Sequence, residues 1–394
     1  MSSESNTPTS VDEDARARPS EEQLRAAHVE LGATREVRAP GPAPDVESLR
    51  AAYLGLLKLS LCDLSGARTL SVSRAGDGRA PGSQVFSREL TADEMALRIK
   101  GADWPFSGLS MIGLPRLDDL QSCVESVVAD GVEGDLIEAG AWRGGASILM
   151  RATLDSLGAQ DRTVWVADSF QGLPAPDEDA FPEDHELDLS QVEFLAVPLE
   201  EVRGYFARFG CERGVEFVPG FFDETLPTLR DLRWSVIRLD GDTYESTWLA
   251  LESLYHGLSR GGYLIVDDYQ LIEECRDAVD AFRREHGITE PIEEIDWNGV
   301  RWRRTSAPPE PARDAARARE VSRRLLDRHS GRAVDRSGHN PIPTERELEV
   351  EYELSQLRQR HAASEAVRER LRRSRLGRWT ARLRRPAGRG RGGG

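Results

Sequence analysis

Five acidic residues follow predicted strands at the points where those strands end. Glu138 ends the first predicted strand and Asp168 the second, while Asp240 follows the fourth and Asp267 and Asp268 follow the fifth. In open parallel α/β sheets, ligands bind beyond the carboxyl ends of the strands. These side chains are therefore the first candidates for chemistry.

Asp240, Asp267 and Asp268 form a candidate metal site. Adjacent parallel strands would bring these carboxylates within several ångströms of one another, where they repel unless a cation lies among them. Oxygen ligands favour a hard ion, Mg²⁺ first and Ca²⁺ or Mn²⁺ second. Each acid alone could be an ordinary strand-exit turn, but the three together favour a metal.

A glycine-rich turn, from Glu138 to Gly145, lies between the first predicted strand and a helix. It lacks the GxGxxG spacing, so its glycines could serve a cofactor or tight strand-to-helix packing. The acid Glu138 favours a ligand that carries a cation and hydroxyls, such as S-adenosylmethionine. Asp168 could accept hydrogen bonds from a ribose diol, although NAD-binding folds place an acid similarly and a turn aspartate is the alternative.

Methyl transfer from a sulfonium requires a strong oxygen nucleophile, and an alcohol at neutral pH is a weak one. A bound metal can lower the pKa of that alcohol, and Asp240 could both bind the metal and accept the proton. His185, in the acidic loop 174–188, is a second catalytic candidate, with a solvated loop histidine as the alternative. The sequence thus predicts metal-assisted O-methylation of a hydroxyl.

Alternating helices and strands predict an α/β fold with about seven strands, mostly parallel, and helices on both faces. The predicted strands are 135–138, 163–167, 216–218, 234–239 and 263–266, closed by an antiparallel pair at 292–295 and 300–303. The predicted helices are one that begins at Val46, then 117–129, 146–157, one whose face holds Leu251, Leu254, Tyr255 and Leu258, and 272–285. Residues 63–89 are expected to form a long loop.

The charge of the chain is unevenly distributed over its 394 residues, which carry a net −16. Residues 304–394 hold about 23 arginines, no lysine and about 12 acids, so this part carries about +11 and the rest about −27. We expect a disordered segment at 1–45, a catalytic domain at 46–305 and an Arg-rich, partly helical tail at 306–394. The tail could bind an acidic partner or an anionic surface, but arginine is so common that individual arginines carry little functional information.

The four cysteines are widely separated and form no CxxC pair, which argues against a zinc or disulfide framework. The first residues lack the apolar core of a signal peptide, and no apolar run approaches the roughly 20 residues of a membrane span. We therefore expect a cytoplasmic protein in a reducing compartment.

Several longer strings resemble the macrocin O-methyltransferase family. They are Ser110-Met111-Ile112-Gly113-Leu114, Asp135-Leu136-Ile137-Glu138 with Trp142-Arg143-Gly144-Gly145, 164–174 (VWVADSFQGLP), 238–247 (RLDGDTYEST) and Ile265-Val266-Asp267-Asp268-Tyr269. The resemblance spans about residues 53–303. It implies a Rossmann-like class I methyltransferase that uses S-adenosylmethionine and Mg²⁺ to methylate a deoxysugar hydroxyl on a macrolide or aminocoumarin, often as a homo-oligomer.

The resemblance also assigns roles to individual positions. Cofactor-binding residues would be Met111, Ile112, Glu138, Gly140, Gly144, Ser147, Asp168 and Ser169. Asp240, Asp267 and Asp268 would hold the metal, with Asp240 as the base. The helix with Tyr53 and Leu57 and the loop with His185 would face the substrate. The long head and the Arg-rich tail depart from the compact form of the family.

Three other interpretations remain open at this point. An NAD-linked oxidoreductase would share the strand-end acid Asp168, but it lacks the GxGxxG turn and has no use for three further acids. A methyltransferase of a cell-surface glycan could use the basic tail as a binding module. A non-catalytic scaffold could act through the tail alone.

Overall fold

The computed structural model describes residues 43–73, 84–177, 179–185, 187–190 and 192–306. The chain divides into two units, Met1–Ala51 and Ala52–Gly394. In the first unit the described residues form the beginning of helix α2 (Val46–Leu61). The predictions for the N-terminal segment before residue 43 and for the Arg-rich tail beyond 306 lie outside the described residues.

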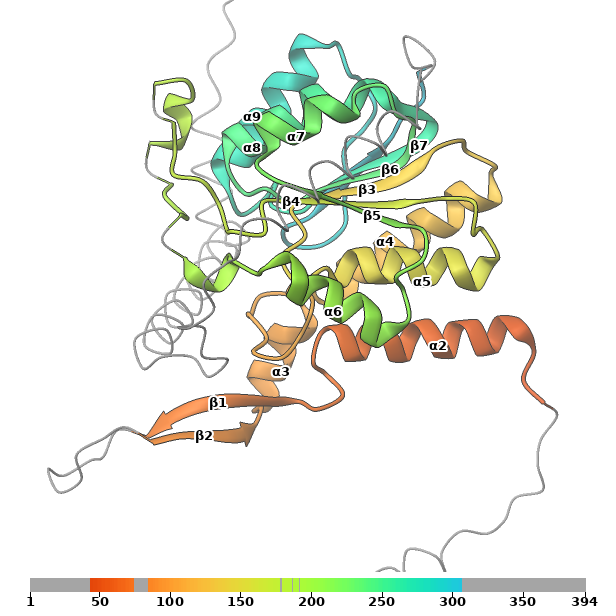
Figure 1. Ribbon diagram of the computed structural model, residues 1–394, viewed down its shortest axis with the longest axis vertical. Coiled ribbons are helices and arrows are strands. Elements are labelled where there is room, and N and C mark those ends of the chain that lie inside the picture. Colours follow the sequence, from red (N-terminus) through yellow and green to blue (C-terminus); the bar gives the residue numbers. More distant parts are fainter. Residues whose placement is uncertain (1–42, 74–83, 178, 186, 191, 307–394) are drawn as a thin grey trace, which may run out of the picture. The chain divides into compact units, whose positions relative to one another are not determined.

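A seven-stranded sheet forms the centre of the second unit, as the sequence predicts (Figure 1). Its strands are β3 (Asp135–Ala139), β4 (Val164–Asp168), β5 (Val215–Pro219), β6 (Trp234–Leu239), β7 (Leu258–Val266), β8 (Glu293–Glu294) and β9 (Val300–Arg303). Their spatial order is β5-β4-β3-β6-β7-β9-β8. The first five run parallel, whereas β9 pairs antiparallel with β7 and β8.

Helices cover both faces of this sheet (Figure 1). Helices α4 (Gly113–Ala129), α5 (Gly145–Leu157) and α6 (Leu199–Phe209) lie on one face. Helices α8 (Tyr244–Leu254) and α9 (Glu273–Glu285) lie on the other, with the short α7 (Phe222–Thr225). Helix α3 (Ala92–Ile99) precedes α4 in the chain. None of the helices in the described part is both long enough and apolar enough to cross a membrane.

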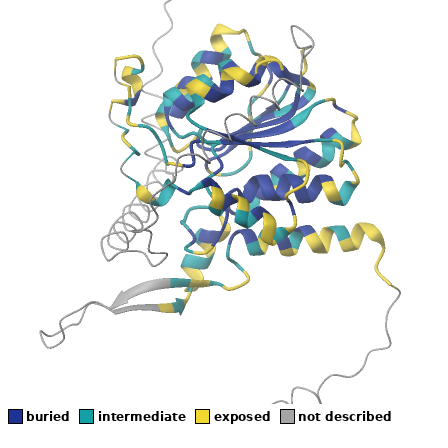
Figure 2. Ribbon diagram, in the orientation of Figure 1, coloured by how far each residue is buried: buried dark blue, intermediate teal, exposed yellow. Residues whose placement is uncertain are grey.

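Alternate strand residues supply two separate hydrophobic cores. Leu136 and Val236 pack with α4 and α5, whereas their neighbours Ile137 and Ile237 pack with α8 and α9. Successive side chains of a strand point to opposite faces, so strands covered on both faces are apolar throughout. Figure 2 shows the strands as the most continuously buried part of the fold.

The region predicted as a long loop contains a hairpin instead. Strands β1 (Arg68–Ser73) and β2 (Gln84–Glu89) pair antiparallel, with Arg68 opposite Glu89. Residues 74–83 between them lie outside the described residues. Each strand has only six residues, and β2 (QVFSRE) does not alternate apolar and polar residues, so this Gly- and Ser-rich stretch gives a weak strand signal.

The helix α8 also ends earlier than its apolar pattern suggested. It stops at Leu254, and Leu258 begins β7 rather than extending the helical face. Gly257 lies between them, where a Cβ atom would stand 2.3 Å from the carbonyl oxygen of Leu232. Tight packing at this glycine allows the chain to turn directly into the strand.

The ends of β3 and β6 approach most closely at Gly140. The Asp240 amide donates to the Ala139 carbonyl at 2.9 Å. Gly140 has φ 89°, and a Cβ there would lie 1.9 Å from the Asp240 carbonyl oxygen. This glycine therefore serves the close approach of two protein backbones, which is the packing alternative for the glycine-rich turn.

Gly140→Ala should destabilise the fold by about 3 kcal/mol or more, since it combines a backbone clash with an unfavourable φ. Gly158→Ala is the matched control, because Gly158 has φ 75° but open space around a Cβ, and it should cost only about 1–2 kcal/mol. Urea unfolding of both variants measures the difference. Equal losses would contradict the close approach.

The carboxylate of Glu290 holds the residues that follow β9. It accepts hydrogen bonds from the Thr305 amide at 2.9 Å, the Thr305 hydroxyl at 3.0 Å and the Ser306 amide at 3.4 Å. Desolvation raises the pKa of Glu290, but these hydrogen bonds outweigh it and lower the pKa to about 2. The charged form therefore fixes the last described residues to the fold.

Glu290→Gln should lower the free energy of unfolding at pH 7 by about 1–3 kcal/mol, since it removes a charged acceptor. A depressed pKa stabilises the fold above the unfolded value of about 4.3 and loses that effect as the pH falls toward about 2. The difference in the free energy of unfolding between wild type and variant should thus become smaller as the pH falls from about 4.5 to 2. Urea unfolding across this range measures it, and a pH-independent gap would contradict the assignment.

Candidate functional site

A cavity of about 1110 Å³ opens at the carboxyl ends of the parallel strands. Its lining includes the five acids predicted from the sequence: Glu138, Asp168, Asp240, Asp267 and Asp268. They come from β3, β4, β6 and the end of β7, which are neighbours in the sheet. The fold thus places all five around one cavity, although their environments differ.

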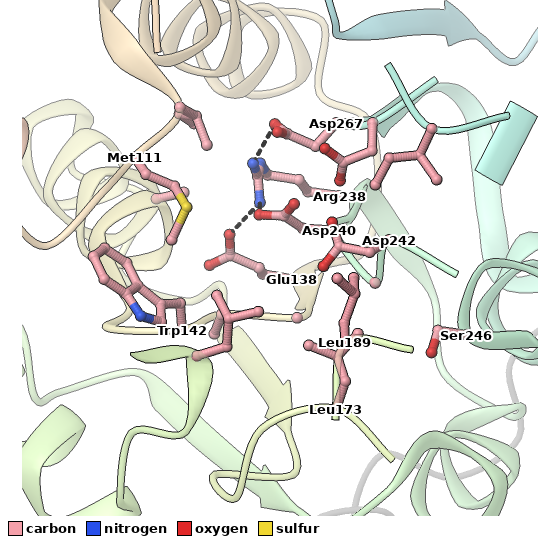
Figure 3. A pocket seen from close by; sticks show the side chains of 18 of the residues that line it. Met111, Glu138, Trp142, Leu173, Leu189, Arg238, Asp240, Asp242, Ser246 and Asp267 are labelled. Carbon is pink, nitrogen blue, oxygen red and sulfur yellow. Dashed lines mark hydrogen bonds and ion pairs between the residues drawn. The ribbon is translucent and has the colours of Figure 1, made fainter. Parts of the chain in front are cut away.

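Arg238, on β6, lies among three of these acids, Glu138, Asp240 and Asp267 (Figure 3). Its side chain is 1% exposed, and its Nη1 donates to Glu138 Oε1 at 2.6 Å and to Asp240 Oδ2 at 2.8 Å. Its Nη2 forms an ion pair with Asp267. Burial would lower the pKa of this guanidinium, but the three carboxylates raise it well above its usual value. Arg238 therefore remains charged and balances the acids around it.

A second buried arginine, Arg116 on α4, contacts Asp267 through its other carboxylate oxygen. It forms ion pairs with Asp267 and, at 3.1 Å, with Asp296. Its Nη2 also donates to the carbonyl oxygen of Gly101 at 2.9 Å. Each oxygen of Asp267 therefore accepts from a guanidinium, Oδ1 from Arg238 and Oδ2 from Arg116.

Asp240 also belongs to a cluster with Asp242 and Asp268, in which one carboxylate oxygen of each residue lies within 4.8 Å of the others. Asp268 Oδ1 accepts from Asn298 Nδ2 at 3.1 Å, whereas Asp268 Oδ2 is buried and has no donor among the described residues. Desolvation and the neighbouring Asp242 raise the pKa of Asp268 well above its usual value. Desolvation and Asp240 raise the pKa of Asp242 to about 7. Such an oxygen cluster fits a divalent cation.

The structure thus brings two of the three predicted metal ligands, Asp240 and Asp268, together with Asp242. The carboxylate of Asp267 is engaged by two arginines, and its role as a metal ligand stays a prediction. Asp242 follows Asp240 by two residues in the turn after β6, where φ of Asp242 is 61°. A residue in this left-handed conformation redirects the chain, so the sequence pattern of strand ends could not place it.

Asp168 accepts hydrogen bonds from the glycine-rich turn, which lines the cavity at the end away from Trp297. Its Oδ2 accepts from the amides of Ala141 at 2.8 Å and Trp142 at 3.1 Å, and its Oδ1 accepts from Phe170 at 2.7 Å. Desolvation raises its pKa, while these hydrogen bonds oppose the shift. Asp168 therefore lines the cavity and also holds the turn in place.

The other predicted cofactor residues divide into two groups. Met111, Ile112, Gly140 and Ser169 line the cavity with Glu138 and Asp168, whereas Gly144 and Ser147 are not among the lining residues. Ser147 is fully buried and donates to Glu138, and desolvation raises the pKa of Glu138 to about 7. Gly144 caps α5, where a Cβ would meet the ring of Phe206 at 2.7 Å.

Two aromatic residues, Trp104 and Trp142, line the cavity, and Trp142 belongs to the glycine-rich turn. Phe194 stacks on Trp104 with ring centroids 5.3 Å apart and also contacts Trp142 at 5.3 Å. The guanidinium of Arg143 lies 4.2 Å from the Trp142 ring centroid and donates to the carbonyl oxygens of Phe106 and Gly108. The glycine-rich turn is thereby joined to the segment before α4.

The acidic loop 174–188 reaches the cavity, but not through its histidine. Leu173 and Leu189, next to this loop, line the cavity (Figure 3). Asp184 is buried and accepts from the amides of Tyr244 and Glu245 at 2.7 and 2.9 Å, so it caps helix α8. His185 is exposed and is not among the lining residues, and its catalytic role stays a prediction.

Neither of the two buried arginines was among the site residues predicted from the sequence. Individual arginines were expected to carry little functional information, and the burial and ion pairs of Arg238 and Arg116 show that this expectation was wrong for both. A signal for Arg238 was present, because it is the one charged residue in the otherwise uncharged strand Trp234–Leu239. A charge in a fully buried strand requires a partner of opposite charge.

Comparisons with known proteins agree with this arrangement. A family model described as Macrocin-O-methyltransferase (TylF) matches residues 80–304. The 8-demethyl-8-(2,3-dimethoxy-alpha-L-rhamnosyl)-tetracenomycin-C 4'-O-methyltransferase of Streptomyces olivaceus is 52% identical over 225 residues, which cover 57% of this chain and 85% of that protein. The demethyldecarbamoylnovobiocin O-methyltransferase of Streptomyces niveus is 46% identical over 222 residues, covering 56% of this chain and 85% of that protein.

A solved structure leads to the same family. The O-methyltransferase NovP matches with a TM-score of 0.58 and 40% sequence identity, covering 65% of this chain and 100% of that one. These matches decide against the NAD-linked alternative, because the family model and the relatives are all O-methyltransferases. The chain belongs to the macrocin O-methyltransferase family and is an O-methyltransferase.

Proposed function

We propose that this enzyme transfers the methyl group of S-adenosylmethionine to a sugar hydroxyl of a glycosylated small molecule, with Mg²⁺ bound beside the acceptor. The observation that carries the proposal is the cluster of Asp240, Asp242 and Asp268 in the same cavity as Asp168. Asp168 offers a carboxylate that can accept hydrogen bonds from the ribose of a nucleoside, and the cluster offers a cation site made only of oxygen atoms. Together in one cavity they suit a reaction between a nucleoside cofactor and a metal-bound acceptor. The sugar is inferred from the relatives, of which one is named for a rhamnosyl tetracenomycin and another for demethyldecarbamoylnovobiocin.

The cofactor would occupy the end of the cavity lined by Met111, Gly140, Trp142 and Asp168. Asp168 would accept the ribose hydroxyls while it keeps its backbone hydrogen bonds to the turn. The buried acid Glu138 is already hydrogen-bonded to Ser147 and Arg238, so its contribution would be to orient this network at the floor of the site.

The acceptor would meet the carboxylate cluster. Asp240 and Asp268 would hold the cation with Asp242 as the third protein ligand, and the bound ion would lower the pKa of the acceptor hydroxyl. S-adenosylmethionine, when bound, would supply the methyl group by displacement at its sulfonium, with S-adenosylhomocysteine as the leaving group. Asp240 accepts the hydroxyl proton, since its side chain is partly exposed to the cavity rather than fully engaged by Arg238.

Asp168→Asn should weaken S-adenosylhomocysteine binding at least about 10-fold, because the ribose loses a charged acceptor. Isothermal titration calorimetry of wild type and variant measures the change. Asp277→Asn on α9, which removes an exposed acid outside the cavity, is the control and should bind as wild type does. Unchanged affinity in Asp168→Asn, with an unchanged thermal unfolding midpoint, would contradict the nucleoside assignment.

Asp240→Asn, Asp242→Asn and Asp268→Asn should each weaken Mg²⁺ binding at least about 10-fold in the presence of S-adenosylhomocysteine, since each removes a charged oxygen ligand. Asp267→Asn should lower the thermal unfolding midpoint, because it leaves two buried guanidinium groups short of a negative partner. It should weaken Mg²⁺ binding less than the three cluster variants do.

Calorimetric Mg²⁺ titration and thermal unfolding of the same samples distinguish the two ligand sets, with Asp277→Asn again as the charge-matched control. If Asp267→Asn abolishes Mg²⁺ binding and Asp242→Asn leaves it intact, the metal ligands are Asp240, Asp267 and Asp268, as the sequence predicts. The cluster with Asp242 would then be the wrong ligand set.

A further inference from the structure

Two large apolar side chains in the cavity lining stay exposed. Leu271 is 51% exposed and Trp297 is 43% exposed, and among the exposed large hydrophobic residues of the described part these two line the cavity. The methyl-transfer chemistry proposed above uses neither of them. Apolar surface that remains open beside a polar site marks a place where a ligand makes contact.

Their position follows from the sheet order. Trp297 lies in the turn between β8 and β9, and Leu271 lies between β7 and α9. Because the order is β4-β3-β6-β7-β9-β8, this turn is at the opposite side of the carboxylate cluster from Asp168. The cavity therefore runs from the nucleoside end, past Asp240 and Asp268, to these two apolar residues.

The Trp297 ring is held in place without being covered. Its Nε1 donates to the carbonyl oxygen of Lys100 at 2.8 Å, and the guanidinium of Arg116 lies 5.7 Å from its ring centroid. Asp296 Oδ1 accepts from the amides of Asn298 and Gly299 at 2.9 and 2.8 Å, which fixes the turn that carries the ring. A fixed, exposed aromatic ring binds a ligand at little entropic cost.

Asn298 joins this apolar surface to the carboxylate cluster. Its side-chain Oδ1 accepts from the Leu271 amide at 2.9 Å, and its Nδ2 donates to Asp268 Oδ1 at 3.1 Å. Its backbone carbonyl accepts from the Gln270 amide at 3.0 Å. Asn298 is 2% exposed, so one buried side chain sets the distance between Asp268 and the apolar pair.

We propose that Trp297 and Leu271 form the subsite for the apolar aglycone of the glycosylated acceptor, an inference that rests on the proposed function. A sugar with its reacting hydroxyl at Asp240 and Asp268 must carry its aglycone away from the cofactor. The exposed pair lies on that side. The cavity of about 1110 Å³ also exceeds the roughly 300–1,000 Å³ typical of small-molecule sites, which leaves room for more than a cofactor and a monosaccharide.

The test compares two glycosides on protein saturated with S-adenosylhomocysteine and Mg²⁺: 4-nitrophenyl α-L-rhamnoside and methyl α-L-rhamnoside. Wild type should bind the aryl glycoside at least about 10-fold more tightly, because only this compound reaches the apolar pair. Trp297→Ala should reduce the ratio to about 2 or less, Leu271→Ala should reduce it partly, and Trp297→Phe should retain most of it.

Tyr205→Ala is the control for loss of an aromatic ring, since Tyr205 lies on α6 and is not among the lining residues; it should keep the wild-type ratio. The inference is overturned if wild type shows no aryl preference or binds neither glycoside, or if Trp297→Ala keeps the preference. It is also overturned if Trp297→Ala loses S-adenosylhomocysteine binding, which would assign the ring to the cofactor end. Failure of wild type to bind S-adenosylhomocysteine would instead contradict the proposed function itself.

Discussion

The buried guanidinium of Arg238 is the interaction on which the rest of the site depends. It contacts acids from three neighbouring strand ends, Glu138, Asp240 and Asp267. Carboxylates in a low-dielectric interior repel one another and lose hydration, and a central cation offsets both effects. Because the partners come from β3, β6 and β7, the same group also fixes these strand ends relative to one another.

The acids of the site fall into two sets that differ in how many of their oxygens are paired with a cation or another donor. Asp267 has both oxygens occupied by Arg238 and Arg116, so it requires no further cation. Asp240, Asp242 and Asp268 share one contact with Arg238 and one with Asn298, and Asp268 Oδ2 lacks a donor within the described residues. Asp267 therefore stabilises the fold, whereas the cluster of Asp240, Asp242 and Asp268 is the set that fits the proposed cation. Mutations in the two sets should consequently affect different properties.

In the rest of the cavity, individual polar side chains form hydrogen bonds to the backbone and also position a group that lines the cavity. Asp168 accepts backbone hydrogen bonds from the glycine-rich turn and still lines the end of the cavity proposed for the cofactor. Asn298 positions Asp268 and the Leu271 backbone with a single amide. Since each such residue connects a binding surface to the backbone, the cavity is largely preorganised before any ligand enters.

Local patterns in the sequence predict the parallel sheet, helices α4, α5, α8 and α9, and the strand ends that carry Glu138, Asp168, Asp240 and Asp268, because continuous apolar runs and helical spacing can be recognised without the fold. They do not reveal the β1–β2 hairpin, whose polar strands give a weak signal. Tertiary packing alone determines that Arg238 and Arg116 contact both oxygens of Asp267, that Asp242 joins the cluster, and that Trp297 lies beyond it. These outcomes depend on residues as far apart in the chain as Arg116 and Asp296, and the distance between two such side chains is set by packing rather than by any local pattern.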